Sequence, residues 1–170
     1  MKKLLIILIL LIPLVSVNAQ ETKSRKEKRA EKEMQKKEEI KKLIDDRSFV
    51  FNASHALPMG GSSINLNYYF NVKIDGDSIQ SYLPFYGVAY TAEYGSRNSP
   101  LDFGTSIEDY SVEKDKNGYQ IQFDVKNGND YLNYTFRISE LGFASLNVTS
   151  TNRQSISFTG KIEPVENDDI

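Results

Sequence analysis

The single histidine, His55, is the first residue to consider for chemistry, and the sequence around it supplies no partners. The chain has no cysteine, and zinc requires three or four ligands, so His55 is predicted to be a surface or loop imidazole. A Ser-His-Asp arrangement would need the same histidine, but no Gly-x-Ser-x-Gly nucleophile elbow occurs. Without cysteine, disulfides, thiol catalysis and thiolate metal sites are also excluded.

Three other short patterns resemble binding motifs but predict turns or loops. Residues 60–63, Gly-Gly-Ser-Ser, lack the Lys-Ser/Thr ending of a phosphate loop and precede a predicted strand. Asp75 and Asp77 bracket a glycine, which favours a turn and offers too few oxygen ligands for calcium. Glu108 and Asp109 are adjacent, so in a strand they would face opposite sides. We therefore predict no catalytic residue, no metal ligand and no cofactor.

Aromatic residues are the unusual feature of the composition, with ten Tyr, nine Phe and no Trp. They cluster between Tyr82 and Tyr90, where strand alternation fails and both faces are apolar or amphipathic. One interpretation is a strand buried on both faces, between a preceding helix and the interior of the domain. The other is a ligand-binding surface at the mouth of a barrel, lined by Tyr82, Phe85, Tyr86 and Tyr90.

The elements that must position these residues have the period of β-strands. Apolar residues occupy every second position from Ile64 to Ile74, which is the clearest strand pattern in the chain. Asn-Gly pairs that begin at Asn117 and Asn127 predict tight hairpins, and Pro84 predicts a strand end, a bulge or an edge strand. About nine strands with hairpin-length links predict an antiparallel meander closed into a small barrel, with a sandwich as the alternative. A small barrel can hold one small ligand.

Before the β domain, residues 20–47 are predicted to form one charged helix. A Ser-x-x-Glu capping box begins at Ser24, and the segment contains neither Gly nor Pro. Ile40, Leu43 and Ile44 alone are spaced to bury a stripe, so we expect only the C-terminal turns to pack on the β domain. The helix is interpreted as a solvated leader, and a basic arm that contacts anionic lipid or another envelope component is the alternative.

The first residues have the pattern of a secretory signal. Lys2 and Lys3 precede the apolar run Leu4–Val15, and small or short residues at Val17–Ala19 suit cleavage before Gln20. The run is short for a membrane span, which needs roughly 20 apolar residues, although an uncleaved anchor is the alternative. Because no cysteine is available for acylation, we expect a free periplasmic or extracellular protein rather than a lipoprotein.

Charge divides the chain near Asp46. The predicted leader carries eleven basic and eight acidic residues, whereas residues 48–170 carry eight basic and fifteen acidic residues. A net-acidic domain is a poor partner for nucleic acid, whose binding depends on neutralised phosphates. The predicted organisation is a signal peptide at 1–19, a leader helix at 20–47, a β domain at 48–163 and an acidic tail at 164–170.

Two segments resemble a known bacterial family. The first is Tyr82-Leu83-Pro84-Phe85-Tyr86-Gly87, and the second runs from Gly142 to Gly160 and includes Asn152-Arg153-Gln154. Together they are similar to domain-of-unknown-function family 4251, secreted proteins of Gram-negative bacteria. The resemblance covers roughly Phe49 to Ile162, and it implies a compact, lipocalin-like β domain without an assigned activity.

Arg153 is the charged residue of interest within the second segment. A guanidinium there could clamp a carboxylate or a phosphate. Equally, it could hold a loop by hydrogen bonding to backbone carbonyl groups.

The leading hypothesis is a non-enzymatic envelope protein that binds a small apolar or amphipathic ligand or a protein partner. Tyr82, Phe85, Tyr86, Tyr90 and Arg153 would line or rim its site. The alternative is a structural or assembly factor with a fully packed barrel and the leader helix as the contact element. A hydrolase is the third hypothesis.

The signal predicts that the mature protein begins at Gln20. Intact mass spectrometry of the protein purified from its own cells should give the mass of residues 20–170, which is 151 residues. A membrane-bound product that still begins at Met1 would instead support the uncleaved anchor.

Overall fold

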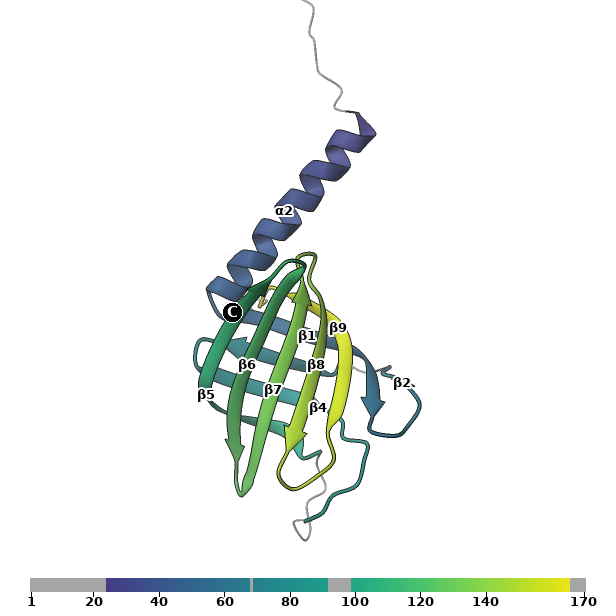
Figure 1. Ribbon diagram of the computed structural model, residues 1–170, viewed down its shortest axis with the longest axis vertical. Helices are drawn as coiled ribbons and strands as arrows, with labels where there is room; N and C mark the ends of the chain where they lie inside the picture. Colours follow the sequence, from purple (N-terminus) through teal and green to yellow (C-terminus); the bar gives the residue numbers. More distant parts are fainter. Residues whose placement is uncertain (1–23, 68, 92–98, 166–170) are drawn as a thin grey trace, which may run out of the picture. The chain divides into compact units, whose positions relative to one another are not determined.

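The computed structural model describes residues 24–67, 69–91 and 99–165 (Figure 1). Met1–Ala30 and Glu31–Ile170 form two compact units, and the strands belong to the second. The expected signal peptide and the last part of the expected acidic tail lie outside the described residues. The elements are α2 (Arg25–Asp45), β1 (Ser48–Pro58), β2 (Ile64–Asn65), β3 (Asn71–Asp75), β4 (Ser78–Leu83), β5 (Leu101–Asp115), β6 (Gly118–Asn127), β7 (Asp130–Ser139), β8 (Phe143–Ser150) and β9 (Ile156–Glu163).

Within the described residues, eight strands form a closed antiparallel barrel (Figure 1). β1 and β3 to β9 follow one another in chain order, and β9 pairs back onto β1 from Val50↔Glu163 to Pro58↔Ile156. β2 is the additional strand, and it pairs with β1 on the side opposite β9. The prediction of a meander closed into a barrel is therefore confirmed, and the sandwich alternative is not the fold.

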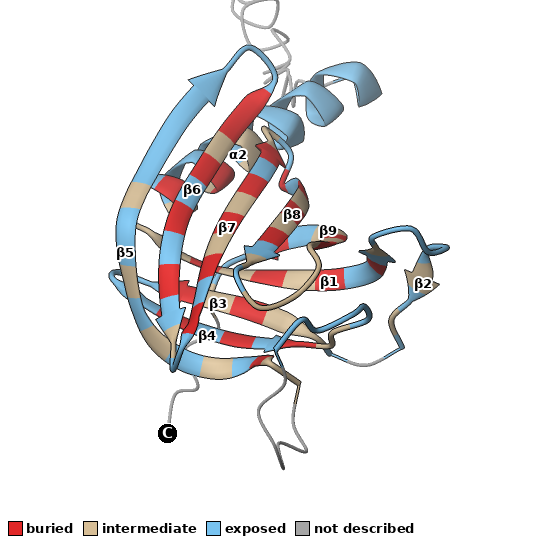
Figure 2. Ribbon diagram, turned by 60° about the horizontal axis from the view of Figure 1, so that its bottom comes forward, coloured by how far each residue is buried: buried red, intermediate tan, exposed pale blue. Residues whose placement is uncertain are grey.

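The inward face of the barrel is apolar along every long strand, and buried and exposed residues alternate along β6 and β7 (Figure 2). This alternation follows from the two-residue period of a strand with one buried face. Large aromatic side chains fill the centre, and six of them are almost completely buried: Phe49, Phe51, Phe123, Tyr134, Phe136 and Phe158.

The predicted helix forms as α2, and its C-terminal turns pack on the barrel as expected. The capping box is present, since the Ser24 N–H donates to Glu27 Oε2 (2.8 Å). Ile40 and Ile44 are buried in the core, and Lys37 Nζ lies 2.9 Å from Glu140 Oε2 at the β7–β8 turn. The hydrogen bond from Lys37 lowers the pKa of the Glu140 carboxyl. Among the described residues, no helix has the length and apolar content needed to cross a membrane.

The strand predicted from Ile64 to Ile74 is interrupted in the structure. β2 and β3 both pair with β1, but two residues of β1, between Asn52 and His55, face five residues between Asn65 and Asn71. The backbone nevertheless stays attached, because the Leu66 N–H donates to Ser54 O (2.9 Å). The interruption inserts more residues than a β-bulge does, and a continuous apolar pattern does not reveal it.

β5 joins two apolar pieces, at 101–103 and 110–112, that the sequence suggests as separate strands. Its register with β6 shifts between Glu108 and Ser111, where Asp109 adopts a φ of 52°. This bulge brings the Tyr110 ring into stacking contact with the core. Glu108 therefore makes the last regular pair before an irregularity of the strand, and Asp109 lies within that irregularity.

Gly160 allows β1 and β9 to approach closely enough to close the barrel. A Cβ atom at this position would lie 1.9 Å from the Asn52 carbonyl oxygen and 3.0 Å from Phe51 Cε2. The same stretch of β1 carries a bulge between Ala53 and His55. Because of this bulge, Ala56 is buried whereas His55 is exposed.

We expect Gly160→Ala to lower the free energy of unfolding by about 1–3 kcal/mol, because the added methyl group forces the strands apart. Gly104→Ala is the matched control within β5, since its Cβ would meet Ile79 O at an ordinary 3.7 Å. Urea unfolding followed by circular dichroism measures both. Equal stability of the two variants would show that closure does not depend on Gly160.

Candidate functional site

Stacked aromatic rings occupy the interior of the barrel. Tyr110, Phe123 and Tyr134 stack in sequence with centroid distances of 5.9 and 5.3 Å. Phe136 makes edge-to-face contacts with Phe51 (5.4 Å) and with Phe49 on the other side. These rings take the central space that a ligand inside a small barrel would need.

Burial raises the pKa values of two tyrosine hydroxyls of this interior. It raises the pKa of Tyr134, and a hydrogen bond from its hydroxyl to Ser81 Oγ (3.3 Å) opposes the shift only partly. Burial also raises the pKa of Tyr110 to about 12, although the nearby Arg47 guanidinium acts in the opposite direction. Both hydroxyls stay protonated well above physiological pH.

The predicted strand at 85–90 is not a strand, and most of it is exposed rather than buried on both faces. Tyr82 and Leu83 make the last pairs of β4, with the first residue of β3 and the first residue of β5. Beyond Leu83 no neighbouring strand continues, and Pro84 has no N–H to donate. The chain therefore leaves the sheet at the strand end that Pro84 predicted.

Backbone hydrogen bonds attach this segment to the loop between β8 and β9. The Tyr90 N–H donates to Asn152 O (2.7 Å), and the Gln154 N–H donates to Val88 O (3.0 Å). The Gln154 side chain accepts a further hydrogen bond from the Val88 N–H (3.1 Å). We call the two segments, residues 84–91 and 151–155, the loop platform.

An ion pair between Arg153 and Asp130 lies beneath the loop platform. Arg153 Nη1 is 2.8 Å from Asp130 Oδ2, and the two side chains are only 11% and 6% exposed. Asp130 Oδ1 also accepts hydrogen bonds from Ser150 Oγ (2.7 Å) and Thr151 Oγ1 (3.2 Å). Arg153 Cζ is 5.8 Å from the centroid of the Phe85 ring. The pair thus links the β4–β5 segment, β7 and the β8–β9 loop.

The five predicted site residues divide into two groups. Tyr82, Tyr86 and Tyr90 reach solvent, with exposed fractions of 49%, 36% and 67%. Phe85 packs against the core, and Arg153 is neutralised by Asp130. Arg153 therefore holds a loop, but it does so through a side-chain carboxylate rather than through the backbone carbonyls considered above.

A groove of about 800 Å³ crosses the outer face of the barrel over β6 to β9 and β1. The floor of the groove consists of small side chains. Ser145 on β8 pairs with Thr159 on β9, and neither side chain points into the core. Arg137 pairs with Ser145 from β7, and Phe143 pairs with Lys161 two residues along. We call this hollow the outer groove.

None of the five predicted residues lines the outer groove. A second hollow of about 330 Å³ lies near Glu108 and Asp124, and these five residues do not line it either. The predicted residues therefore form a surface at the end of the barrel rather than the lining of either hollow.

His55 lies within β1 on the outer face, as an exposed imidazole that also lines the outer groove. Its Nδ1 is 3.0 Å from Ser54 Oγ, a contact that the sequence reasoning did not consider. Ser54 Oγ also lies 2.9 Å from Thr159 O, so its hydroxyl can donate to this carbonyl or to the imidazole, according to the tautomer of His55. In the described part of the chain, no group of three or more His, Asp or Glu residues is arranged to hold a metal ion.

The family model for a domain of unknown function, DUF4251, matches residues 31–162. The chain belongs to the DUF4251 family. A crystal structure of a DUF4251 family protein from Bacteroides eggerthii DSM 20697 is similar in fold, with a TM-score of 0.56 and 12% sequence identity. The alignment covers 76% of this chain and 87% of that protein. No curated protein matches the chain.

The two sequence segments that resembled DUF4251 meet in the loop platform. Gly87 of the first segment faces Gln154 of the second, and a Cβ on Gly87 would lie 3.0 Å from Phe85 Cζ. Gly160, at the end of the second segment, makes the close approach that closes the barrel. At both positions, close packing of neighbouring atoms favours glycine over a residue with a Cβ atom.

The sequence reasoning missed Asp130 and the residues of the outer groove. Asp130 follows an Asn-Gly turn, where an acidic residue is ordinarily explained as turn chemistry. Arg137, Phe143 and Lys161 lie on three different strands, and no local spacing indicates that they share a face. In the sequence, each of these residues alternates with apolar residues, which indicates that it faces outward. To see that the three share one part of the outer face, the register between the strands must also be known.

We expect Asp130→Asn to lower the free energy of unfolding by about 3–5 kcal/mol, because the buried Arg153 charge loses its partner. The matched control is Asp77→Asn, which breaks the exposed pair between Arg47 Nη1 and Asp77 Oδ1 (3.1 Å). That change should cost below about 1 kcal/mol.

The double variant Asp130→Asn/Arg153→Met should recover much of the loss, since no unpaired charge remains. Urea unfolding curves measure all three variants. If Asp130→Asn costs no more than Asp77→Asn, the ion pair does not hold the loop platform.

Proposed function

We propose that the protein is an exported, non-enzymatic binding module that contacts a protein partner through its loop platform. The observation that carries this proposal is the filled barrel interior, which leaves the outer surface as the place for recognition. The barrel then serves as a rigid scaffold, and its loops present the contact residues.

The loop platform has the composition of a protein-binding surface. Tyr86, Val88 and Tyr90 are exposed on the segment 84–91, and Tyr82 is exposed near the end of β4, two residues before this segment. Tyrosine provides a large amphipathic contact area at a low cost in side-chain entropy, and it is enriched at protein interfaces. The hydrogen bond from the Tyr90 N–H to Asn152 O and the one from the Gln154 N–H to Val88 O hold the segment in place before binding.

A non-enzymatic role is supported by the chemistry of the described residues. The buried Tyr134 hydroxyl stays protonated, and the Arg153 charge is paired with Asp130. A small amphipathic ligand is the second candidate for binding, and the outer groove is the observation that favours it. Export rests on the signal at residues 1–19 and on the resemblance to secreted relatives.

Site-specific photocrosslinking in the native cells tests the protein-partner proposal. A benzoylphenylalanine at Tyr90 should give one discrete protein adduct, and Tyr82→Ser/Tyr86→Ser should weaken its formation at least several-fold. Phe143 is the matched control position, because it is 56% exposed and lies at the opposite end of β8 from the loop platform. No adduct from Tyr90, or the same adduct from both positions, would contradict the proposal.

A further inference from the structure

The outer groove contains two cations without an acidic partner. The Arg137 side chain is exposed and makes no hydrogen bond or ion pair with any described residue. Lys161 contacts the Phe143 ring, with Nζ 4.8 Å from the centroid, and pairs with no described carboxylate. Side chains on the outer face that are unpaired in this way are free to bind an anion from solution.

Two carboxylates also line the outer groove, and both already accept hydrogen bonds. Asp115 Oδ1 accepts from the Lys116 N–H (2.6 Å), and Glu163 Oε2 accepts from Asn52 Nδ2 (2.8 Å). Asp115 lies at the end of β5, and Glu163 lies at the end of β9, two residues beyond Lys161. An anion therefore fits best over Ser145, away from these two strand ends.

The register of the strands sets the relative positions of Arg137 and Lys161. Arg137 and Lys161 lie on β7 and β9, and Ser145 lies between them on β8. The short serine side chain leaves space that a longer residue would fill. Phe143 offers an exposed ring beside Lys161, so an apolar group attached to the anion finds a surface to pack on.

We propose that the outer groove binds an amphipathic carboxylate, with the carboxylate held between Arg137 and Lys161 and the apolar chain against Phe143. The planar guanidinium of Arg137 matches a carboxylate in two-point contact, and Lys161 adds a second charge. The groove volume of about 800 Å³ lies in the range typical of small-ligand sites. This site is separate from the loop platform, so either one can fail without the other.

Titration of the purified protein with decanoate, followed by ¹⁵N amide chemical shifts, tests this inference. The shift changes should concentrate on Arg137, Ser145, Thr159 and Lys161. Decanol, which has the same chain without the charge, should bind at least about tenfold more weakly, because charged hydrogen bonds are lost.

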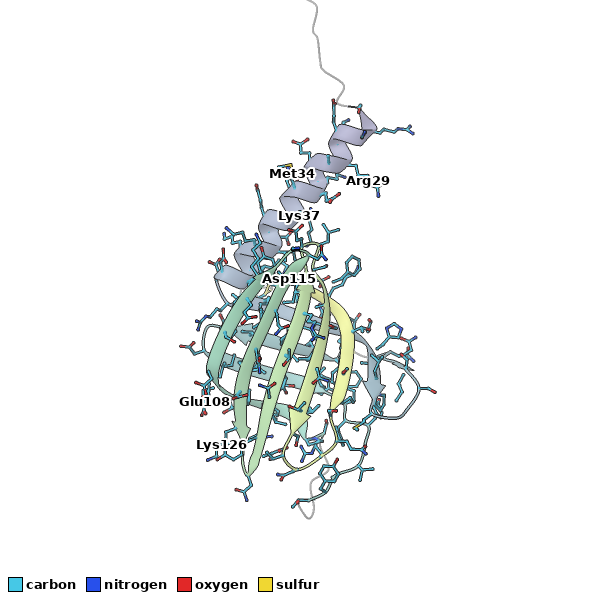
Figure 3. The ribbon with its side chains drawn as sticks, in the orientation of Figure 1. Arg29, Met34, Lys37, Glu108, Asp115 and Lys126 are labelled. Carbon is cyan, nitrogen blue, oxygen red and sulfur yellow. The ribbon has the colours of Figure 1, made fainter. Side chains whose placement is uncertain are left out.

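Arg137→Gln and Lys161→Gln should each weaken decanoate binding by about tenfold. Lys126→Gln is the matched control, because Lys126 also stacks on an exposed aromatic ring, Tyr131, with Nζ 5.4 Å from the centroid. Figure 3 shows Lys126 and Asp115 at opposite ends of the barrel strands, so the control lies away from the outer groove.

Three results would overturn the proposal: no binding at millimolar decanoate, equal affinity for decanol, or equal loss in Lys126→Gln. Shift changes confined to the loop platform would also overturn it, because they would place the ligand on the other surface. All three substituted side chains are exposed, so unfolding curves of the variants should match that of the parent protein.

Discussion

Closure of the sheet between β1 and β9 is the constraint on which the other features of the molecule depend. The two backbones come so close that position 160 has no room for a Cβ atom, and the bulge after Ala53 adjusts the register there. Once the sheet is closed, every inward side chain of the barrel faces another one. The aromatic residues then fill the centre of the barrel with rings in mutual contact.

A filled barrel moves recognition to the outside of the molecule. The ends of the strands carry loops, and one pair of loops is fixed by backbone hydrogen bonds above a buried ion pair. The outer face carries polar side chains, because one face of each strand must meet solvent. These two surfaces differ in chemistry, since the loops present tyrosine and the outer groove presents unpaired positive charge.

Arg153 and Arg137 show how the same residue type takes different roles in this fold. Arg153 lies beneath a loop, where burial requires a partner, and Asp130 together with two hydroxyl groups meets that need. Arg137 projects from the middle of a strand into solvent, so it needs no partner within the chain. Sequence reasoning favoured Arg153 because its neighbours formed a motif, but a charge that is already neutralised has little left for a ligand.

The sequence by itself determined the charged helix and the antiparallel meander, because helix capping, residue period and turn residues act over a few neighbouring positions. Hairpin-length links favoured a barrel over a sandwich, but closure is a long-range pairing of β1 with β9 that only the tertiary structure decided. The sequence did not determine the break between β2 and β3, the bulge at Asp109 or the exposed path of residues 84–91. Those features depend on which strand pairs with the chain at each residue, and that pairing is set by the tertiary structure. The Asp130–Arg153 pair and the outer groove likewise exist only in the tertiary structure, because strand register brings together residues that are far apart in the chain.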